Sequence, residues 1–232
     1  MTYYDKLASK WHKITGYKGG AFKELILNEL VISKINRIES KSILEIGAGN
    51  GYFMPMLLKK KSGQRPQKLM ITDISTKQLE TAKKIFKISY AEYRMLDVYK
   101  KFSIENNSVD IIISNMVFNE LKGVGLKNGL KECERILKIG GRIIISVLHP
   151  EFVEIQIKRG VVKNNLMIST EGFRVPVVQR SLQEYKSSLE SADINYTLDN
   201  AYGNQALYNI KPKLKELKGI PIALIIIGTI SK

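Results

Sequence analysis

The chain has little cysteine, little histidine and no long hydrophobic run. Its 232 residues include one cysteine and two histidines. The single Cys133 excludes an internal disulfide and a zinc site built from cysteines, so we expect it to pack in the interior. No group of Asp, His and Asn has the spacing of a metal site, and we predict no bound metal. No apolar run reaches the ~18 residues of a membrane span, and residues 1–6 are polar, so we expect a cytoplasmic protein without a signal peptide or membrane partner.

Acidic residues are also scarce relative to basic ones. There are 22 Asp and Glu against 37 Lys and Arg, a net charge of +15. Such a charge attracts polyanions. The basic residues are mostly lysines spread over separate stretches, whereas phosphate and base recognition favours arginine. We therefore interpret them as solvated helix faces, and nucleic acid or an acidic carrier protein stays as the less favoured partner.

Composition indicates one globular domain over residues 1–232, with 44% hydrophobic and 25% charged residues. Apolar residues recur at helical spacing over residues 3–14 and again over 21–38, with glycines between, so residues 1–38 predict two helices. Tyr4 and Trp11 lie on the first helix. Two interpretations of them stand, ligand contact or packing of an amphipathic helix.

Residues 42–53 form the stretch around which the rest of the chain is arranged. Ile43, Leu44 and Ile46 predict a strand buried on both faces. Three alternating glycines then predict a sharp turn into a helix, whose free N–H groups suit a carboxylate or phosphate. The spacing is G-x-G-x-G, with Glu45 two residues before the first glycine, and differs from the G-x-G-x-x-G of dinucleotide-binding turns.

This stretch resembles the first motif of the class I S-adenosylmethionine (SAM) methyltransferases. The resemblance implies a doubly wound, Rossmann-like α/β fold with seven strands, the last of them antiparallel, a helical lid at residues 1–38, and SAM as cofactor with S-adenosylhomocysteine as product. The alternative is a glycine-rich turn in another α/β domain. The implied cofactor-binding residues of this stretch are Glu45, Gly47, Ala48, Gly49, Asn50 and Gly51.

Two further acids follow predicted strands. Asp73 ends a strand over residues 69–75, about 20 residues after the glycines, where a doubly wound fold places the carboxylate that binds a ribose diol. Ser75 predicts the N-cap of a helix over residues 76–86, so a structural role for this corner is the alternative. The resemblance adds Ile74 here, and it implies that Asp97 and Val98 contact the adenine.

A β-branched run from Val109 predicts a central strand that ends in Ser114-Asn115-Met116, at the edge where such sheets bind ligands. The resemblance makes this the fourth motif and assigns Asn115 and Met116 to the cofactor. The motif Ser-Asn-Met-Val differs from the Asp/Asn-Pro-Pro-Tyr of adenine and glutamine methyltransferases, which argues against those acceptors.

The second half predicts a helix over 126–137, a left-handed cap at Gly140 and Gly141, and a fifth strand over 142–148. The phrase from Arg135 to Arg142 resembles the R-x-L-K-P-G-G turn of small-molecule methyltransferases, with Ile139 in place of proline. Residues 151–180 break the strand and helix alternation, and we interpret them as an insertion that carries acceptor specificity. A helix over 181–191, a strand over 194–198 and a last antiparallel edge strand over 220–230 follow.

Candidate catalytic and acceptor residues surround the predicted crevice. His149 follows the fifth strand and is either a general base or a structural residue before Pro150. We favour the structural role, because the sequence offers no orienting carboxylate. Tyr4 is a second catalytic candidate. The residues expected at the acceptor are Tyr3, Trp11, Asn119, Glu120 and His149.

We therefore expect direct in-line transfer of a methyl group from SAM to an N or O atom of a small molecule, including secondary metabolites. One alternative is an RNA acceptor or a substrate tethered to a carrier protein, which lysines clustered at the crevice mouth would favour. The other alternative is a non-catalytic SAM-binding subunit. Oligomeric state and the identity of the acceptor are left open.

Overall fold

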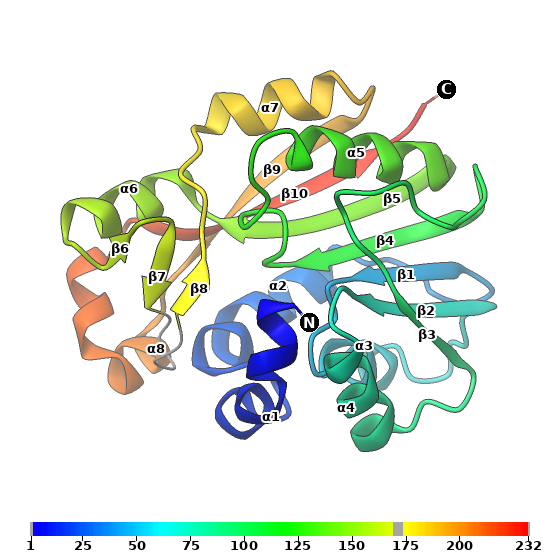
Figure 1. Cartoon of the computed structure of the whole chain (residues 1–232), viewed down its shortest axis with the longest axis horizontal. Coiled ribbons are helices and arrows are strands. Elements are labelled where there is room, and N and C mark those ends of the chain that lie inside the picture. The colour runs from blue at the N-terminus through cyan, green and yellow to red at the C-terminus, as the bar shows by residue number, and fades with distance from the viewer. Residues whose placement is uncertain (1, 169–173, 232) are drawn as a thin grey trace.

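A seven-stranded sheet forms the centre of the molecule (Figure 1). The computed structural model describes residues 2–168 and 174–231. The strand order is β3-β2-β1-β4-β5-β10-β9, with β1 to β5 parallel to one another and β10 antiparallel to both of its neighbours. The predicted doubly wound fold with an antiparallel last strand is thus confirmed. The strands of this sheet are β1 Ser42–Ile46, β2 Lys68–Asp73, β3 Ala91–Met95, β4 Val109–Asn115, β5 Leu137–Leu148, β9 Asn195–Tyr202 and β10 Pro221–Thr229.

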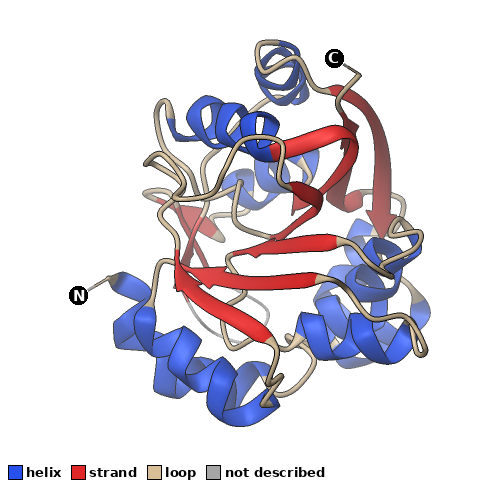
Figure 2. Ribbon diagram, turned by 90° about the vertical axis from the view of Figure 1, so that its right-hand side faces the viewer, coloured by secondary structure: helices blue, strands red, loops and turns tan. Residues whose placement is uncertain are grey.

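Helices cover both faces of this sheet (Figure 2). The helices α5 and α7 pack on one face, and α2, α3 and α4 pack on the other. The remaining elements lie beyond the carboxyl ends of the strands, with α1 close to the end of β1. None of the helices in the described part of the chain is long and apolar enough to cross a membrane. The helices are α1 Tyr3–Thr15, η1 Lys23–Leu27, α2 Asn28–Ser33, α3 Phe53–Lys60, α4 Thr76–Phe86, α5 Gly125–Ile136, α6 Pro150–Lys158, α7 Leu182–Glu190, α8 Gln205–Ile210 and η2 Pro212–Leu217.

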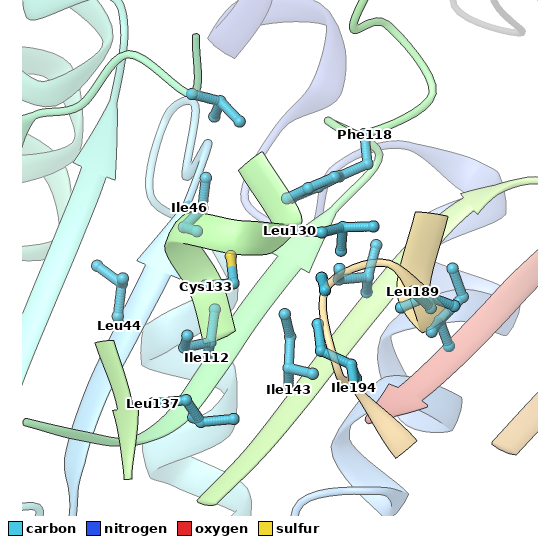
Figure 3. Packing of buried hydrophobic residues seen from close by; sticks show 14 of the residues in the cluster. Leu44, Ile46, Ile112, Phe118, Leu130, Cys133, Leu137, Ile143, Leu189 and Ile194 are labelled. Carbon is cyan, nitrogen blue, oxygen red and sulfur yellow. The ribbon is translucent and has the colours of Figure 1, made fainter. Parts of the chain in front are cut away.

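The core between the sheet and α5 and α7 explains why the central strands are so apolar (Figure 3). Strand β1 is buried along its whole length, as expected for a parallel strand that is covered on both faces. Leu130 and Cys133 of α5 pack against Ile112 and Ile143 of the sheet. Cys133 is fully buried and unpaired, and burial raises the pKa of its thiol. Its predicted packing role is confirmed.

The second N-terminal helix differs from its prediction. Residues 21–33 are helical, but Lys23–Leu27 form a π-helical turn, and the helix ends at Ser33 instead of residue 38. The guanidinium of Arg142 donates to the carbonyl of Lys34 (2.8 Å), which satisfies the helix end. Residues 35 and 38 are buried without being helical. The helical spacing of apolar residues therefore extends beyond the end of the helix, which is why the sequence predicted a longer helix.

The glycines after α5 also have another role than predicted. Helix α5 ends at Ile136 with an extended residue, Leu137, and β5 begins there at once. Gly140 has a φ of 72° inside this long strand, and its N–H donates to the carbonyl of Ile230 (3.0 Å). The glycine therefore bends the start of the strand. The expected left-handed helix cap at this position was wrong.

The segment after β5 was expected to leave the strand and helix alternation, but it begins with a regular helix, α6. A three-stranded antiparallel sheet follows, with β6 Val162–Lys163, β7 Leu166–Ile168 and β8 Arg174–Pro176. Part of the predicted insertion, residues 169–173, lies outside the described residues. Strand β10 lies between β5 and β9, so its expected place at the sheet edge was wrong and β9 is the edge strand. Figure 1 shows α6 and the sheet of β6, β7 and β8 beyond the carboxyl ends of β4 and β5.

Candidate active site

A cavity of about 1300 Å³ lies at the carboxyl ends of β1, β2 and β4. Doubly wound sheets bind their ligands at this edge, because the strand order reverses there and leaves a crevice. Here the order reverses between β1 and β4. Of the residues proposed from the sequence, those that line the cavity are Tyr4, Trp11, Glu45, Gly47, Ala48, Gly49, Asn50, Asp73, Ile74, Asp97, Val98, Asn115, Met116, Asn119 and Glu120.

The three glycines of the turn after β1 are required for two different reasons. All have positive φ angles. A Cβ on Gly47 would lie 2.1 Å from Val117, and a Cβ on Gly51 would lie 2.5 Å from Ala82, so these two glycines permit close packing of the protein itself. A Cβ on Gly49 would meet nothing closer than the Trp11 indole nitrogen at 3.7 Å. Gly49 therefore leaves open space in the cavity, as a ligand cradle requires.

Asp73, at the end of β2, holds the glycine turn in place. Its carboxylate accepts hydrogen bonds from the N–H groups of Gly49 (2.8 Å) and Ser75 (2.9 Å). Burial raises the pKa of Asp73, and the two amide donors oppose that rise. Each carboxylate oxygen has a second acceptor position, so the group can still bind a diol. Ser75 caps α4 as predicted, and its hydroxyl is the acceptor for Gln78 N–H.

Helix α1 lies across the cavity and is hydrogen-bonded to three segments of its wall. The Ser75 hydroxyl donates to Asp5 (2.6 Å), and the Asn50 amide contacts a ring nitrogen of His12 (3.0 Å). The Tyr4 hydroxyl donates to the carboxylate of Glu120 in the segment after β4. The three partner residues lie in the loops that follow β1, β2 and β4. The first helix therefore closes the edge at which all three strands end.

Two carboxyl groups of the cavity lining, the buried Glu45 and the half-buried Glu120, are both close enough to Lys23 to feel its charge. Burial raises the pKa of Glu45 and of Glu120 to about 8 each, the negative charge of Asp73 adds to the rise, and the nearby Lys23 ammonium lowers both values. Tyr4 further lowers the pKa of Glu120 by its hydrogen bond. The same carboxylate and burial raise the pKa of the Tyr4 hydroxyl. Both Glu side chains therefore change protonation close to neutral pH.

The raised pKa of Glu45 predicts a specific dependence of stability on pH. A carboxyl group with a raised pKa in the folded state stabilises the fold at low pH, and this contribution is lost as pH rises from about 4.5 towards about 8. We expect Glu45→Gln to lose less folding free energy between pH 5.5 and 8.5 than the parent in urea denaturation. Glu132→Gln serves as control, because the pKa of Glu132 is lowered and lies below this window. Parallel pH profiles of parent and Glu45→Gln would contradict the prediction.

The end of β4 is strained and carries polar atoms without partners. Met116 has a φ of 63°, an unusual value for a side chain of this kind, and such strain tends to gather at functional sites. The amide nitrogen of Asn115, the amide oxygen of Asn119 and Glu45 Oε2 are buried and have no hydrogen-bond partner within residues 2–168 and 174–231. Buried polar groups are normally paired. Together with the open space over Gly49, these atoms fit a polar ligand such as SAM.

Asp97 and Val98 lie two and three residues beyond the end of β3, which ends at Met95. The Asp97 carboxylate accepts from the N–H of Tyr99 (3.0 Å). Both residues line the cavity, as does Ile74 after β2. The side chains expected at ribose and adenine therefore lie along one wall of the same cavity.

His149 and Tyr3 are not among the described residues that line the cavity. The His149 ring caps α6, because its Nδ1 accepts from the N–H of Glu151 (3.3 Å), and partial burial lowers its pKa. The Tyr3 hydroxyl donates to the carbonyl of Arg174 in β8. Both residues therefore contact elements that enclose the site.

The geometry favours the structural role of His149. We expect His149→Ala to cost about 0.5–2 kcal/mol of folding free energy, the usual effect of removing an N-cap, while turnover at saturation stays within about tenfold of the parent. Urea denaturation and steady-state kinetics on the same preparation check this. A loss of turnover by several powers of ten in a stably folded variant would instead identify His149 as a general base.

Several cavity residues had no signal in the sequence. Lys23 reaches the site because it lies on the π-helical turn, and its ammonium lies 5.5 Å from the centre of the Tyr52 ring. Lys211, between α8 and η2, and Lys213, in η2, also line the cavity, although 160 residues separate Gly51 from Lys211. Only the three-dimensional arrangement of the added elements brings them there.

Comparison with known proteins identifies the central part of the chain. Residues 44–145 match the family Methyltransf_11, described as a methyltransferase domain. A stretch of 121 residues, 49% of this chain, is 29% identical to polyketide synthase 19 of Gibberella fujikuroi and covers 5% of that protein. The chain thus spans a small fraction of the length of this curated relative.

Solved structures match over most of the chain. A structure of the complex between the Haloferax volcanii Trm112 methyltransferase activator and a methyltransferase aligns over 100% of this chain and 99% of its own, with 14% identity and a TM-score of 0.73. An SAM-dependent methyltransferase from Listeria monocytogenes aligns over 88% and 96%, with 17% identity and a TM-score of 0.70. At these identities the likeness concerns the fold. The predicted resemblance is confirmed: residues 44–145 match the methyltransferase domain model, and the chain has the fold of the class I SAM-dependent methyltransferases.

Proposed function

We propose that this chain transfers a methyl group from SAM to an N or O atom of a small-molecule acceptor. One observation carries the proposal. A single cavity contains both the open space above Gly49 beside Asp73 and the half-buried, hydrogen-bonded pair Tyr4 and Glu120. The first feature suits a cofactor, and the second suits a polar atom of a second molecule. Two ligands side by side in one cavity are what a methyl transfer requires.

Of the residues proposed to hold SAM, all except Gly51 line the cavity at the ends of β1 to β4, and Gly51 instead packs against Ala82 beneath the turn. When bound there, SAM would supply a methyl group made electrophilic by its positive sulfonium. Asp73 would bind the ribose and Asp97 with Val98 the adenine, while the glycine turn and Glu45 would face the amino-acid end. Asn115 and Asn119 offer the unpaired amide atoms described above. The full proposed set is Glu45, Gly47, Ala48, Gly49, Asn50, Gly51, Asp73, Ile74, Asp97, Val98, Asn115 and Met116.

The chain itself would contribute alignment, exclusion of water and a proton acceptor. Helix α1 places Tyr4 and Trp11 over the cavity, and exclusion of water strengthens each polar contact inside it. An acceptor hydroxyl or ammonium must lose a proton before or during transfer. Glu120 is suited to take it, because a general base works best when its pKa lies near the working pH. Tyr4 would orient this carboxylate by its hydrogen bond.

Replacement of Asp73 tests the cofactor wall. We expect Asp73→Ala to weaken SAM binding by about 1.5–3 kcal/mol, the range for hydrogen bonds to a charged group. Asp110→Asn is the matched control, since Asp110 lies in β4 and accepts from Ser42 N–H (2.9 Å) and Lys138 (2.7 Å) outside the cavity lining. Calorimetric titration of both variants with SAM measures the effect. Unchanged affinity in Asp73→Ala would remove Asp73 from the ribose site.

The distribution of lysines bears on the macromolecular alternative. Among described residues, the basic side chains that line the cavity are Lys23, Lys122, Arg159, Lys211 and Lys213. The lysine runs over 59–61, 83–87 and 100–101 lie outside the lining, on and after α3 and α4 and after β3. An RNA-binding face would require a continuous basic surface around the mouth. This distribution supports the small-molecule acceptor over RNA.

The proposal is tested by turnover. SAM is incubated with the full chain and a panel of amines, phenols, carboxylic acids, structured RNA and carrier-tethered substrates, and product masses are determined. We expect a mass gain of one methyl group on small molecules together with formation of S-adenosylhomocysteine. Methylation confined to RNA or to carrier-tethered substrates would contradict the choice of acceptor. SAM binding without any methylated product across the panel would favour a non-catalytic subunit.

A further inference from the structure

Helix α6 contributes a buried polar side chain to the wall of the cavity. Phe152 and Gln156, four residues apart on one face of this helix, both line the cavity and are only 6% and 5% exposed. The isoleucines on either side of the glutamine, Ile155 and Ile157, are only half-buried. An amphipathic helix normally buries its most apolar residues. Helix α6 therefore buries an amide at a position where packing alone favours an aliphatic side chain.

The cavity wall around this part of α6 is apolar. The helix packs against β6 and β10 (Figure 1). Four buried side chains line the cavity here and belong to one apolar cluster, and each is at most 9% exposed. They are Leu148, Phe152, Met167 and Ile222, which we call the apolar chamber. The chamber suits the apolar body of a ligand, and Gln156 places an amide beside it.

The side-chain amide of Gln156 has no protein partner in the described part of the chain. Its main-chain carbonyl accepts from the N–H of Val161 (2.9 Å), but the side chain forms no hydrogen bond with residues 2–168 and 174–231. Polar groups buried this deeply are normally paired. Solvent reaches the amide through the cavity that it lines. A molecule that fills the chamber displaces this solvent, so the amide is left unpaired unless the molecule supplies a partner.

We propose that Gln156 selects acceptors that carry a carbonyl or hydroxyl group on an otherwise apolar body. Resting on the function proposed above, this inference places the body in the apolar chamber and its oxygen at the Gln156 amide. The amide can donate to a carbonyl, and it can donate to or accept from a hydroxyl. A site built to bind such a group rejects a molecule that lacks it, because the buried polar atoms of the site are then left without partners. This oxygen is distinct from the atom to be methylated, which is assigned to the neighbourhood of Glu120.

Small probes that share a phenyl ring test the preference for an oxygen. Acetophenone carries a carbonyl, phenylethanol carries a hydroxyl, and ethylbenzene carries neither. Each is titrated into the ¹⁵N-labelled full chain, with and without S-adenosylhomocysteine, and the side-chain amide signals of Gln156 are followed by NMR. We expect acetophenone and phenylethanol to shift these signals more than ethylbenzene does, since the effect of the ring is common to all probes. Equal shifts with and without the oxygen would overturn the proposal.

Gln156→Met removes the amide and keeps an unbranched side chain of similar length. The ratio of the ethylbenzene Kd to the acetophenone Kd should fall about two- to tenfold in this variant, the usual effect of one neutral hydrogen bond. Urea denaturation should show a variant at least as stable as the parent, because a buried unpaired amide is lost. Gln183→Met is the matched control, since Gln183 is exposed on α7 outside the described lining, and it should keep the ratio of the parent. An unchanged ratio in Gln156→Met would overturn the assignment.

These outcomes are separable from the function on which the inference rests. The probe titrations without S-adenosylhomocysteine report the apolar chamber alone, and a titration of S-adenosylhomocysteine reports the cofactor site alone. A Kd ratio that depends on Gln156, without binding of S-adenosylhomocysteine, would overturn the proposed function and support the oxygen site. Binding of S-adenosylhomocysteine with a Kd ratio that is the same in parent and Gln156→Met would support the function and overturn the inference.

Discussion

Gly49→Val is expected to reduce SAM affinity by more than about a hundredfold, or about 2.8 kcal/mol. The reason is that the new side chain would occupy space that the cofactor needs. No protein atom lies within 3.7 Å of the position of a Cβ on Gly49, so the valine side chain extends into the cavity space that the cofactor would fill. The variant is expected to stay folded, because this side chain meets no packed neighbour. Calorimetric titration with SAM and urea denaturation measure the two effects.

The positive φ of Gly49 requires a control for backbone strain. Gly49 has a φ of 56°, and a β-branched residue there costs about 1–3 kcal/mol whatever the surroundings. Gly63 has a φ of 84° in the turn between α3 and β2, with nothing within 4 Å of its Cβ position, and is not among the described lining residues. Gly63→Val should therefore lose similar folding free energy and keep its SAM affinity. Equal SAM affinities in the two variants would show that the turn is not the cradle.

Glu120→Gln is expected to lower turnover by about two to four powers of ten with SAM affinity unchanged. The parent's activity should rise with pH through about 8, because a general base acts in its deprotonated form and burial raises the pKa of Glu120 to that value. This rise should vanish in Glu120→Gln. Rate profiles from pH 6 to 10 with a substrate found in the panel provide the measurement.

Tyr4→Phe separates a proton acceptor from a structural carboxylate. The hydrogen bond from Tyr4 lowers the pKa of Glu120, so its removal should move the rise in activity to higher pH. A residue that only supports the fold would not shift this profile. Glu24→Gln is the control, since Glu24 pairs with Lys18 outside the described lining. A Glu120→Gln variant with full turnover and an unchanged pH profile would contradict the proposed role.

The cofactor wall could be predicted because local chemistry specifies it. A strand covered on both faces needs the apolar run of Ile43, Leu44 and Ile46, and a sharp turn needs glycines such as Gly49. Asp73 was predictable because the carboxyl ends of neighbouring parallel strands lie together, which fixes its distance along the chain. Each signal lies within about 30 residues of the glycine turn. Local patterns of this kind can be recognised in the sequence without knowledge of the tertiary structure.

The acceptor side of the cavity could not be predicted, because tertiary contacts determine which residues line it. Residues 151–180 were interpreted as an insertion outside the strand and helix alternation, yet the cap at His149 and the proline that follows it start a helix. The end of α2 depends on Arg142, more than 100 residues away. Lys211 reaches the cavity because α8, the helix before it, packs against η1. No spacing in the sequence encodes these contacts.

The most direct test of the central claim is a calorimetric titration of S-adenosylhomocysteine into the full, unaltered chain, followed by displacement with SAM. The account predicts one site per chain, competition between the two compounds, and loss of binding in Gly49→Val but not in Gly63→Val. Absence of heat above dilution at millimolar concentrations of both compounds would contradict the claim that the cavity at the ends of β1, β2 and β4 is a cofactor site.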